Sequence, residues 1–387
     1  MLDSIFFAYS RAEKYVDAED YNIWKFPAKQ EAAERQKVPI ILNYSIMTRA
    51  YGACFNDDSF IDVFNDYGFD VYLMDWGKDT PAATTGWTLD KLAKELDRAV
   101  DNLLKEYKVP QLNIFGICIG GLIISHMINT SSKRKEDYAD KFQKIAYYGS
   151  PILGARDLGM AKTFSDVYKK MLPFREFGGF INVPMWMLDA FIVEGTSLAL
   201  LKQSWQEFWH DGPKTFLRMM ALSCDDRWVP FAAFMDLLQE AFASQGEQDS
   251  AGEEQFHFIN LMKETCFFNL VGEHDSLVAP SASIVDWTSS APERFKYVKL
   301  DNDKPEQPGF EQVIFPGGHF IFAQPGFRNI KERLARWFVY YPDPDHKKYP
   351  YGKSRDTRSI THLPAADGPR LTLRVCPIRG TEGVRAT

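Results

Sequence analysis

Short apolar runs alternate with helix-like segments over the first 150 residues of the chain. Three of these runs have the length and apolar content of buried strands: Val38 to Tyr44, Phe69 to Met74 and Leu112 to Phe115. Between them, Phe60 to Gly68 is expected to form a helix that ends at its glycine. Thr88 to Tyr107 is expected to form a long amphipathic helix capped by Thr88. This order predicts a mostly parallel, doubly wound sheet.

The same alternation stops and then resumes towards the C-terminus. The next predicted strand is Ile145 to Gly149, and two later strands are predicted at Cys266 to Val271 and Gln312 to Phe315. A closing helix is predicted over Arg328 to Tyr340. Residues 153–263 between them are rich in aromatic residues and are expected to be helical. We interpret this insertion as a cap or lid over a site, although the aromatic content alone equally fits more core.

The stretch Leu112 to Ser125, LNIFGICIGGLIIS, contains the strongest chemical signal in the chain. It predicts a strand, a tight turn that carries Cys118, and an apolar helix from about Gly121. A nucleophile between Gly116 and Gly120 is typical of a nucleophile elbow, where glycines let strand and helix approach and the helix N-terminus favours thiolate over thiol. A buried structural cysteine is the alternative that these residues alone leave open.

Two backbone amides are predicted to stabilise an oxyanion next to this cysteine. The first is the amide of Ile119, which directly follows the nucleophile. The second comes from the loop after the first central strand, where Met47 is our choice and Ile46 is the alternative. No side chain in that loop indicates which of the two it is.

An acidic residue and a histidine follow two late predicted strands. With Cys118 they could form a catalytic triad. Asp275 comes after the strand that begins at residue 266, and His319 lies in a Gly-Gly-His-Phe loop after the last strand. Because active-site groups gather at the carboxyl ends of parallel strands, we expect the three to meet. Glu273 stays open as the acid, although Asp275 sits later in the turn. The order nucleophile, acid, histidine predicts an α/β-hydrolase fold.

The predicted organisation of the chain therefore has four parts. Residues 1–37 form a helical or irregular lead-in that packs on the domain. Residues 38–152 and 264–344 form the α/β-hydrolase core, and residues 153–263 form the helical cap or lid. Residues 345–387 are expected to be a poorly ordered C-terminal tail, because their composition shifts to Lys, Arg, Pro, Gly and Thr.

Composition narrows the classes of partner. The net charge of −7 gives no bulk attraction to nucleic acid or to an anionic membrane. The five cysteines are scattered without a C-x-x-C pair, so we expect neither a disulfide framework nor a zinc site. The same pattern predicts that the protein works in the reducing cytoplasm. No apolar run reaches the length of a transmembrane segment.

From about residue 38 to residue 340 the chain resembles the polyhydroxyalkanoate synthases. The motifs that support the resemblance are Gly116-Ile117-Cys118 with Gly120-Gly121, VYLMDWG at 71–77, Thr88-Leu89-Asp90, Asp225-Asp226 with Ala233-Phe234, DSLVAP at 275–280 and Gly317-Gly318-His319. Ile119 stands where the family usually has glutamine, and Phe320 stands where it has isoleucine. The short chain resembles the synthases that work with a second subunit.

The resemblance implies an acyltransferase that polymerises (R)-3-hydroxyacyl-CoA into polyhydroxyalkanoate with release of CoA. Cys118 would hold the growing chain as a thioester, His319 would activate the thiol, and Asp275 would help to deprotonate the 3-hydroxyl, directly or through His319. The acyl-CoA is the substrate, and no separate cofactor is implied. Implied partners are a second synthase subunit and the surface of a polymer granule, in a cytoplasmic homodimer or hetero-oligomer.

Two other functions use the same residues. An intracellular polyhydroxyalkanoate depolymerase or thioesterase would share the Cys118, His319 and Asp275 set but release free acid. A degenerate family member would instead act as a binding subunit, with an inert Cys118.

Overall fold

The structure is a computed structural model. It describes residues 9–29, 35–46, 50–54, 59–77, 88–131, 141–151, 170, 182–184, 228–230, 266–272, 275, 278, 283, 310–315, 319, 327–340 and 374–375.

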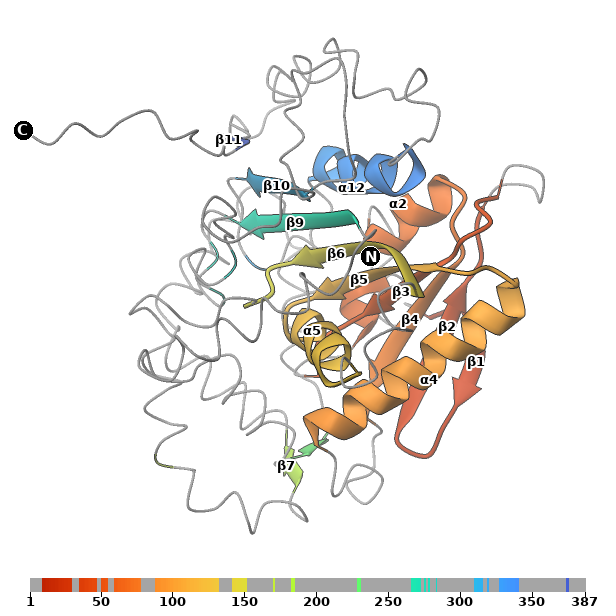
Figure 1. The fold of residues 1–387 in the computed structure, drawn as a ribbon, viewed down its shortest axis with the longest axis vertical. Helices are drawn as coiled ribbons and strands as arrows, with labels where there is room; N and C mark the ends of the chain where they lie inside the picture. The colour runs from red at the N-terminus through yellow and green to blue at the C-terminus, as the bar shows by residue number, and fades with distance from the viewer. Residues whose placement is uncertain are drawn as a thin grey trace, which may run out of the picture.

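A twisted sheet forms the centre of the described part of the chain (Figure 1). Its strands stand in the spatial order β1-β2-β4-β3-β5-β6-β9-β10-β11. Their bounds are β1 Glu13–Asp17, β2 Tyr21–Phe26, β3 Ile40–Asn43, β4 Val71–Trp76, β5 Leu112–Ile117, β6 Phe142–Tyr148, β9 Cys266–Gly272, β10 Phe310–Phe315 and β11 Arg374–Val375. Every pairing from β4 to β10 is parallel, as the alternation predicted.

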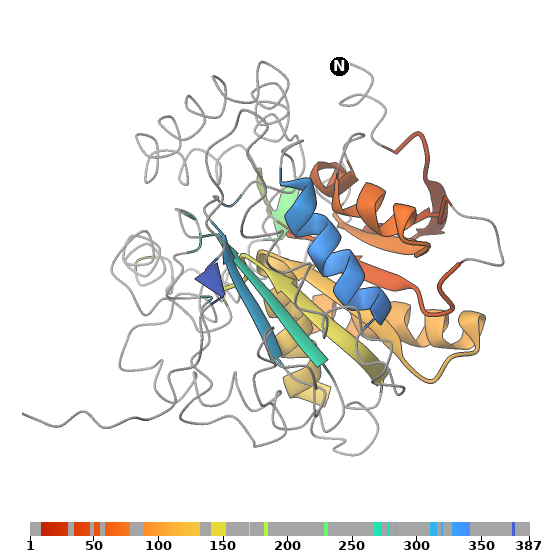
Figure 2. The same cartoon turned by 90° about the horizontal axis from the view of Figure 1, so that it is seen from above.

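Helices cover both faces of this sheet (Figure 2). On one face α4 (Leu89–Tyr107) packs on α5 (Ile119–Ser131), and on the other α2 (Phe60–Asp66) packs on α12 (Arg328–Tyr340). A short 3-10 helix, η1 (Ala50–Cys54), follows β3. The Thr88 side chain accepts a hydrogen bond from the Lys91 amide at 3.3 Å, which confirms the predicted cap of α4.

The N-terminal segment differs from the prediction of a helical or irregular lead-in, which is wrong for residues 13–26. These residues form the hairpin β1–β2, and β2 pairs antiparallel with β4 to extend the sheet. The sequence signal is weak because β1 is an edge strand whose residues are half-buried or exposed and carry mixed charges, so the apolar alternation of a half-buried strand is lost.

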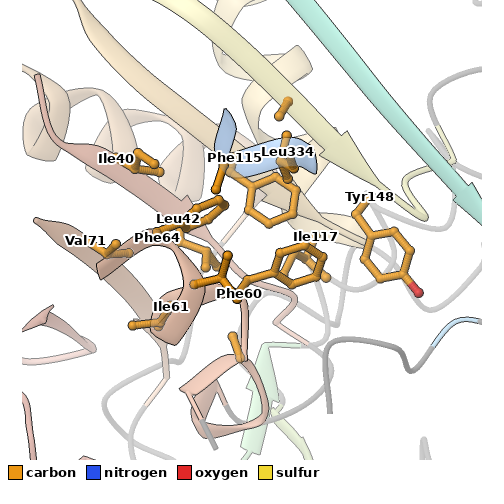
Figure 3. Close-up of a cluster of buried hydrophobic side chains, with 14 of the residues drawn as sticks. Ile40, Leu42, Phe60, Ile61, Phe64, Val71, Phe115, Ile117, Tyr148 and Leu334 are labelled. Atoms are coloured by element: carbon orange, nitrogen blue, oxygen red, sulfur yellow. The ribbon is translucent and has the colours of Figure 1, made fainter. Parts of the chain in front are cut away.

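Two apolar clusters fill the space between the sheet and the helices, one on each face. The cluster under α2 and α12 includes Phe60, Phe64 and Phe115, whose rings pack edge to face or tilted with centroids 5.0 to 6.1 Å apart (Figure 3). Tyr148 stands at the edge of this cluster with its hydroxyl directed away from it. The cluster fixes the ends of β5 and β6 from which the site is built.

Other predicted elements are confirmed in part. Helix α5 begins at Ile119, two residues before the predicted start, and β6 begins at Phe142. Within the predicted tail, residues 374–375 form β11, which pairs antiparallel with β10. These two residues therefore belong to the sheet and not to a poorly ordered appendage. The cap lies outside the described residues, except for Lys170 and an antiparallel pair of short strands, β7 (Asn182–Pro184) and β8 (Trp228–Pro230). Among the helices that the structure describes, none has the length and apolar character to cross a membrane.

Candidate active site

Cys118 occupies the turn between β5 and α5, as the elbow pattern predicted. Its φ is 56°, a left-handed conformation that residues with a Cβ rarely adopt. Two backbone hydrogen bonds maintain the turn: the Cys118 amide donates to the Tyr148 carbonyl at 2.9 Å, and the Gly121 amide donates to the Cys118 carbonyl at 3.0 Å. Cys118 is partly exposed as a residue, whereas Cys54 and Cys266 are buried.

The glycines around Cys118 are required by close backbone contacts. A Cβ on Gly116 would lie 2.6 Å from the Cα of Gly121, and a Cβ on Gly120 would lie 2.1 Å from the carbonyl oxygen of Asn43. Both distances are far below a van der Waals contact. Strand β5 and helix α5 therefore approach as closely as the G-x-C-x-G pattern predicted, and α5 also contacts the end of β3.

His319 and Asp275 form a buried pair beside this turn. The histidine Nδ1–H donates to Oδ2 of Asp275 at 2.7 Å, and both side chains are at most 4% exposed. The other carboxylate oxygen, Oδ1, accepts the amide of Val278 at 2.8 Å. With Nδ1 on the carboxylate, Nε2 is the ring nitrogen left for the thiol of Cys118, to which the imidazole is hydrogen-bonded. The structure thus brings Cys118, His319 and Asp275 together.

The electrostatics of the pair favour a charged imidazole. Burial by itself lowers the pKa of His319, but the Asp275 carboxylate and Cys118 act in the opposite direction through charge and hydrogen bonds. Together they hold the pKa of His319 well above its usual value. A histidine in this environment can accept a proton from the neighbouring sulfur and keep it while a thiolate reacts.

The predicted oxyanion groups are placed in part. Ile119 is the first residue of α5, so its amide stands at the helix N-terminus directly after Cys118. Met47 lies outside the described residues, and Ile46 is buried in the core with 5% of its surface exposed. Glu273 is also outside the described residues, and the carboxylate in contact with the histidine is Asp275.

Reasoning from the sequence missed two residues near the site, Asn43 and Tyr148, and noted Trp76 only as part of a family motif. The Asn43 amide donates to the Gly120 carbonyl at 2.8 Å, and its Oδ1 accepts the indole N–H of Trp76 at 2.8 Å. The Tyr148 hydroxyl donates to the His319 carbonyl at 2.7 Å. The one sequence signal for the contact between Asn43 and Gly120 is a polar asparagine in the otherwise apolar run Val38 to Tyr44.

A mostly parallel sheet with helices on both faces and a cysteine in the turn of a nucleophile elbow defines an α/β-hydrolase-fold protein. The crystal structure of a monoacylglycerol lipase from Paleococcus ferrophilus has the same fold, with a TM-score of 0.51 at 14% identity over 83% of this chain and 98% of that one. This likeness concerns the fold alone. No protein-family model matches the chain.

Curated relatives identify the family within this fold. The poly(3-hydroxyalkanoate) polymerase subunit PhaC of Thiocystis violacea is 37% identical over 313 residues, which cover 78% of this chain and 81% of the relative. The PhaC subunit of Allochromatium vinosum is 24% identical over 326 residues, or 81% of this chain and 84% of that protein. The chain therefore belongs to the PhaC family of poly(3-hydroxyalkanoate) polymerase subunits, as its motifs predicted.

Proposed function

We propose that this protein is an acyltransferase that polymerises (R)-3-hydroxyacyl-CoA into polyhydroxyalkanoate and releases CoA. The observation that carries the proposal is the contact of His319 with both Cys118 and Asp275 at the ends of parallel strands. The names of the PhaC relatives support the polymerase activity. The acyl-CoA is the substrate in this scheme, and no step requires a separate cofactor.

The first step is acylation of Cys118. Nε2 of His319 takes the thiol proton while the sulfur attacks the thioester carbonyl of the acyl-CoA. The carbon–sulfur bond to CoA breaks, the CoA sulfur leaves with the proton returned by His319, and the acyl group stays on Cys118 as a new thioester. The oxyanion of the intermediate would be stabilised by the Ile119 amide, and the start of α5 at this residue supports that role.

A cysteine suits this exchange better than a serine. A thiolate that attacks a thioester forms another thioester at nearly equal free energy, so loading from CoA is reversible and the acyl group stays reactive. An oxygen ester on serine would be a more stable intermediate. The residue type at position 118 therefore favours transfer between thiols over hydrolysis of oxygen esters.

The second step is elongation by a 3-hydroxyl group. His319 takes the hydroxyl proton, the hydroxyl oxygen attacks the Cys118 thioester, and an oxygen ester forms as the thiol is released and reprotonated. Both oxygens of Asp275 are already engaged, one by Nδ1 of His319 and one by the Val278 amide. This supports a role for Asp275 through His319 rather than by direct contact with the substrate.

The test is incubation of the purified protein with (R)-3-hydroxybutyryl-CoA, with and without a candidate second subunit. Free CoA, free acid and insoluble polymer are followed together. We expect CoA release with polymer, and a dependence on the second subunit would fit a short catalytic chain. CoA release matched by free acid would overturn the proposal in favour of a thioesterase or depolymerase. The absence of any product with every candidate subunit would favour a binding subunit. Oligomeric state, granule association and a cytoplasmic location stay predictions.

A further inference from the structure

Tyr148, the last residue of β6, contacts both the elbow cysteine and the histidine. Its carbonyl oxygen accepts the amide of Cys118 at 2.9 Å. Its hydroxyl donates to the carbonyl oxygen of His319 at 2.7 Å, across 171 positions of the sequence. Its ring also stacks near the imidazole, with centroids 6.1 Å apart and planes 23° apart. Tyr148, which is fully buried, thus joins the backbone of Cys118 through its own backbone to the backbone of His319 through its side chain.

The two anchors of His319 act on different parts of the residue. Asp275 binds Nδ1 and fixes the rotation of the ring, but a hydrogen bond to the ring does not by itself fix the position of the His319 backbone. The Tyr148 hydroxyl binds the carbonyl and so fixes the backbone. Both are needed to define where Nε2 stands relative to the Cys118 sulfur.

The residue after Tyr148 keeps the strand end close to the same pair. Gly149 has a φ of +51°, and a Cβ on it would lie 3.0 Å from Nδ1 and Cε1 of His319 and 3.2 Å from Oδ2 of Asp275. Its amide donates to the Leu270 carbonyl on β9, the strand that leads to Asp275. The end of β6 is therefore where the segments of the cysteine, the histidine and the acid meet.

We propose that Tyr148 is a positioning residue that sets the distance between His319 and Cys118. The inference rests on the proposed function only in that His319 activates the thiol. The alternative is a purely structural role, because Tyr148 also packs near Phe60 and Phe315 with centroids 5.9 and 6.2 Å away. A structural role predicts lower stability without a specific effect on the reactivity of the thiol.

The test uses Tyr148→Phe, which keeps the ring and its packing but removes the donor to His319. The matched control is Tyr147→Phe, one residue earlier on the same strand. Tyr147 is also buried, belongs to the core cluster on the other face, and pairs its hydroxyl with Ser125 at 3.3 Å. Each variant thus loses one buried phenol hydroxyl, but only one of them loses a contact to the site.

Two experiments are done on each variant at a fixed neutral pH. The first measures the rate of alkylation of Cys118 by iodoacetamide, followed by peptide mass mapping, and the second measures kcat and KM for CoA release. We expect Tyr148→Phe to lower the alkylation rate and kcat by about fivefold to tenfold with KM changed less than about twofold, because one hydrogen bond is lost. Tyr147→Phe should leave the alkylation rate, kcat and KM near their wild-type values.

Equal effects of the two substitutions on alkylation would overturn the inference. If Tyr148→Phe does not fold, 4-fluorophenylalanine at position 148 replaces it, since the fluorine fills the space of the hydroxyl but cannot donate. An unchanged alkylation rate in that variant would also overturn the inference. Alkylation needs no acyl-CoA, so it tests the positioning role even if the wild-type protein releases no CoA. That second result would count against the proposed function alone.

Discussion

At the scale of single residues, the backbone of Cys118 is held in a conformation that its own side chain disfavours. A left-handed φ of 56° costs a residue with a Cβ on the order of 1 kcal/mol relative to glycine. The hydrogen bonds to Tyr148 and Gly121 maintain it. The residue held in this conformation is also the one whose thiol interacts with the ring of His319, so backbone strain and reactivity coincide at one position.

Glycine and alanine at position 118 should therefore differ in stability. Both variants lack the thiol and should form no covalent acyl-enzyme, but Cys118→Gly should have a free energy of unfolding about 1 kcal/mol higher than Cys118→Ala. Urea unfolding of the two variants measures the difference.

A helical position supplies the control. Ala99→Gly in α4 should lower the free energy of unfolding by about 2 kcal/mol, because glycine disfavours the helix and a buried methyl group is also lost. This is the opposite order for the same pair of residues. If Cys118→Ala is as stable as Cys118→Gly, the turn is not strained in solution.

At the scale of elements, two strands and a helix are joined by one buried asparagine. Asn43 ends β3, accepts the indole N–H of Trp76 at the end of β4, and donates to the Gly120 carbonyl in the first turn of α5. The N-terminus of α5, with the amide of Ile119, is thereby fixed to the sheet. This contact gives Trp76, part of the Asp-Trp-Gly motif, a structural reason to stand near the site.

Asn43→Ala should disturb both the fold and the chemistry. It leaves the Trp76 indole and the Gly120 carbonyl without these partners in a buried place, which should lower the free energy of unfolding by about 2 to 4 kcal/mol. The shift of α5 should also slow acylation of Cys118 by (R)-3-hydroxybutyryl-CoA. Urea unfolding and covalent labelling by the acyl-CoA measure the two effects.

Asn113→Ala on β5 is the matched control. Asn113 is as deeply buried, but its Oδ1 has no hydrogen-bond partner among the described residues. Its removal should cost less and leave acylation unchanged. Equal losses from the two substitutions would show that the Asn43 contacts contribute nothing specific.

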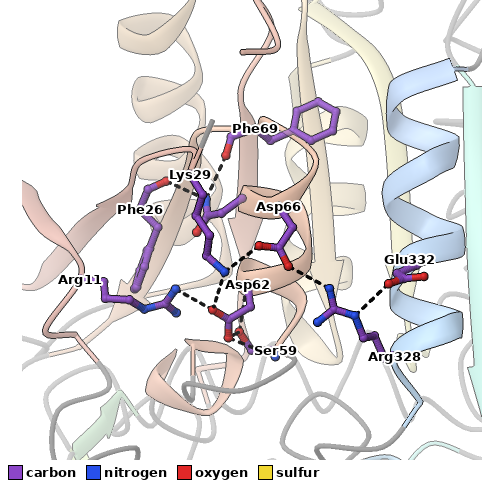
Figure 4. A network of polar contacts seen from close by, with 10 residues as sticks. Arg11, Phe26, Lys29, Ser59, Asp62, Asp66, Phe69, Arg328 and Glu332 are labelled. Carbon is purple, nitrogen blue, oxygen red and sulfur yellow. Dashed lines mark hydrogen bonds and ion pairs between the residues drawn. The ribbon is translucent and has the colours of Figure 1, made fainter. Parts of the chain in front are cut away.

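At the scale of the whole molecule, an ion-pair network joins three distant parts of the chain (Figure 4). Arg11 lies 2.6 Å from Asp62 in α2, Lys29 lies 2.7 Å from Asp66, and Arg328 at the start of α12 lies 2.9 Å from Asp66. The N-terminal segment, α2 and the closing helix are therefore tied together on one face of the sheet.

The contribution of Asp66 should depend on pH. Burial alone raises the pKa of Asp66, but the hydrogen bonds and charges of Lys29 and Arg328 outweigh it and hold this pKa below its usual value. A lowered folded-state pKa gives stability that is present above the unfolded pKa of about 3.9 and is lost as pH falls through the folded value. Asp66→Asn should thus cost about 1 kcal/mol near neutral pH and progressively less below about pH 4.

Asp17→Asn controls for the general effect of removing an acidic residue. Asp17 pairs with Lys14 at 3.1 Å on the surface, with 58% of its side chain exposed, and should contribute only a few tenths of a kcal/mol. Urea unfolding across a pH series compares the two variants with the wild type. A cost of Asp66→Asn that stays constant down to low pH would contradict this account.

The sequence by itself determined the order of elements and the nature of the reactive groups. Helical and strand periodicity are local properties, so α12 could be predicted with both of its ends and α4 with its Thr88 cap. The G-x-C-x-G pattern is local at Gly116, whose close contact with Gly121 lies within one strand-turn-helix unit. Gly120 is required by the backbone of Asn43 on the neighbouring strand β3, which is distant in sequence.

Only the tertiary structure decided which groups meet. The hairpin β1–β2 gains its stability by pairing with β4, a contact that its mixed polar sequence does not encode. Asp275 rather than Glu273 was an open choice until the contact with His319 placed one carboxylate on the ring. Tyr148 gave no signal at all, since its partner lies 171 residues away. Local patterns specify backbone conformation, whereas partners distant in sequence are selected only when the packed sheet brings its strand ends together.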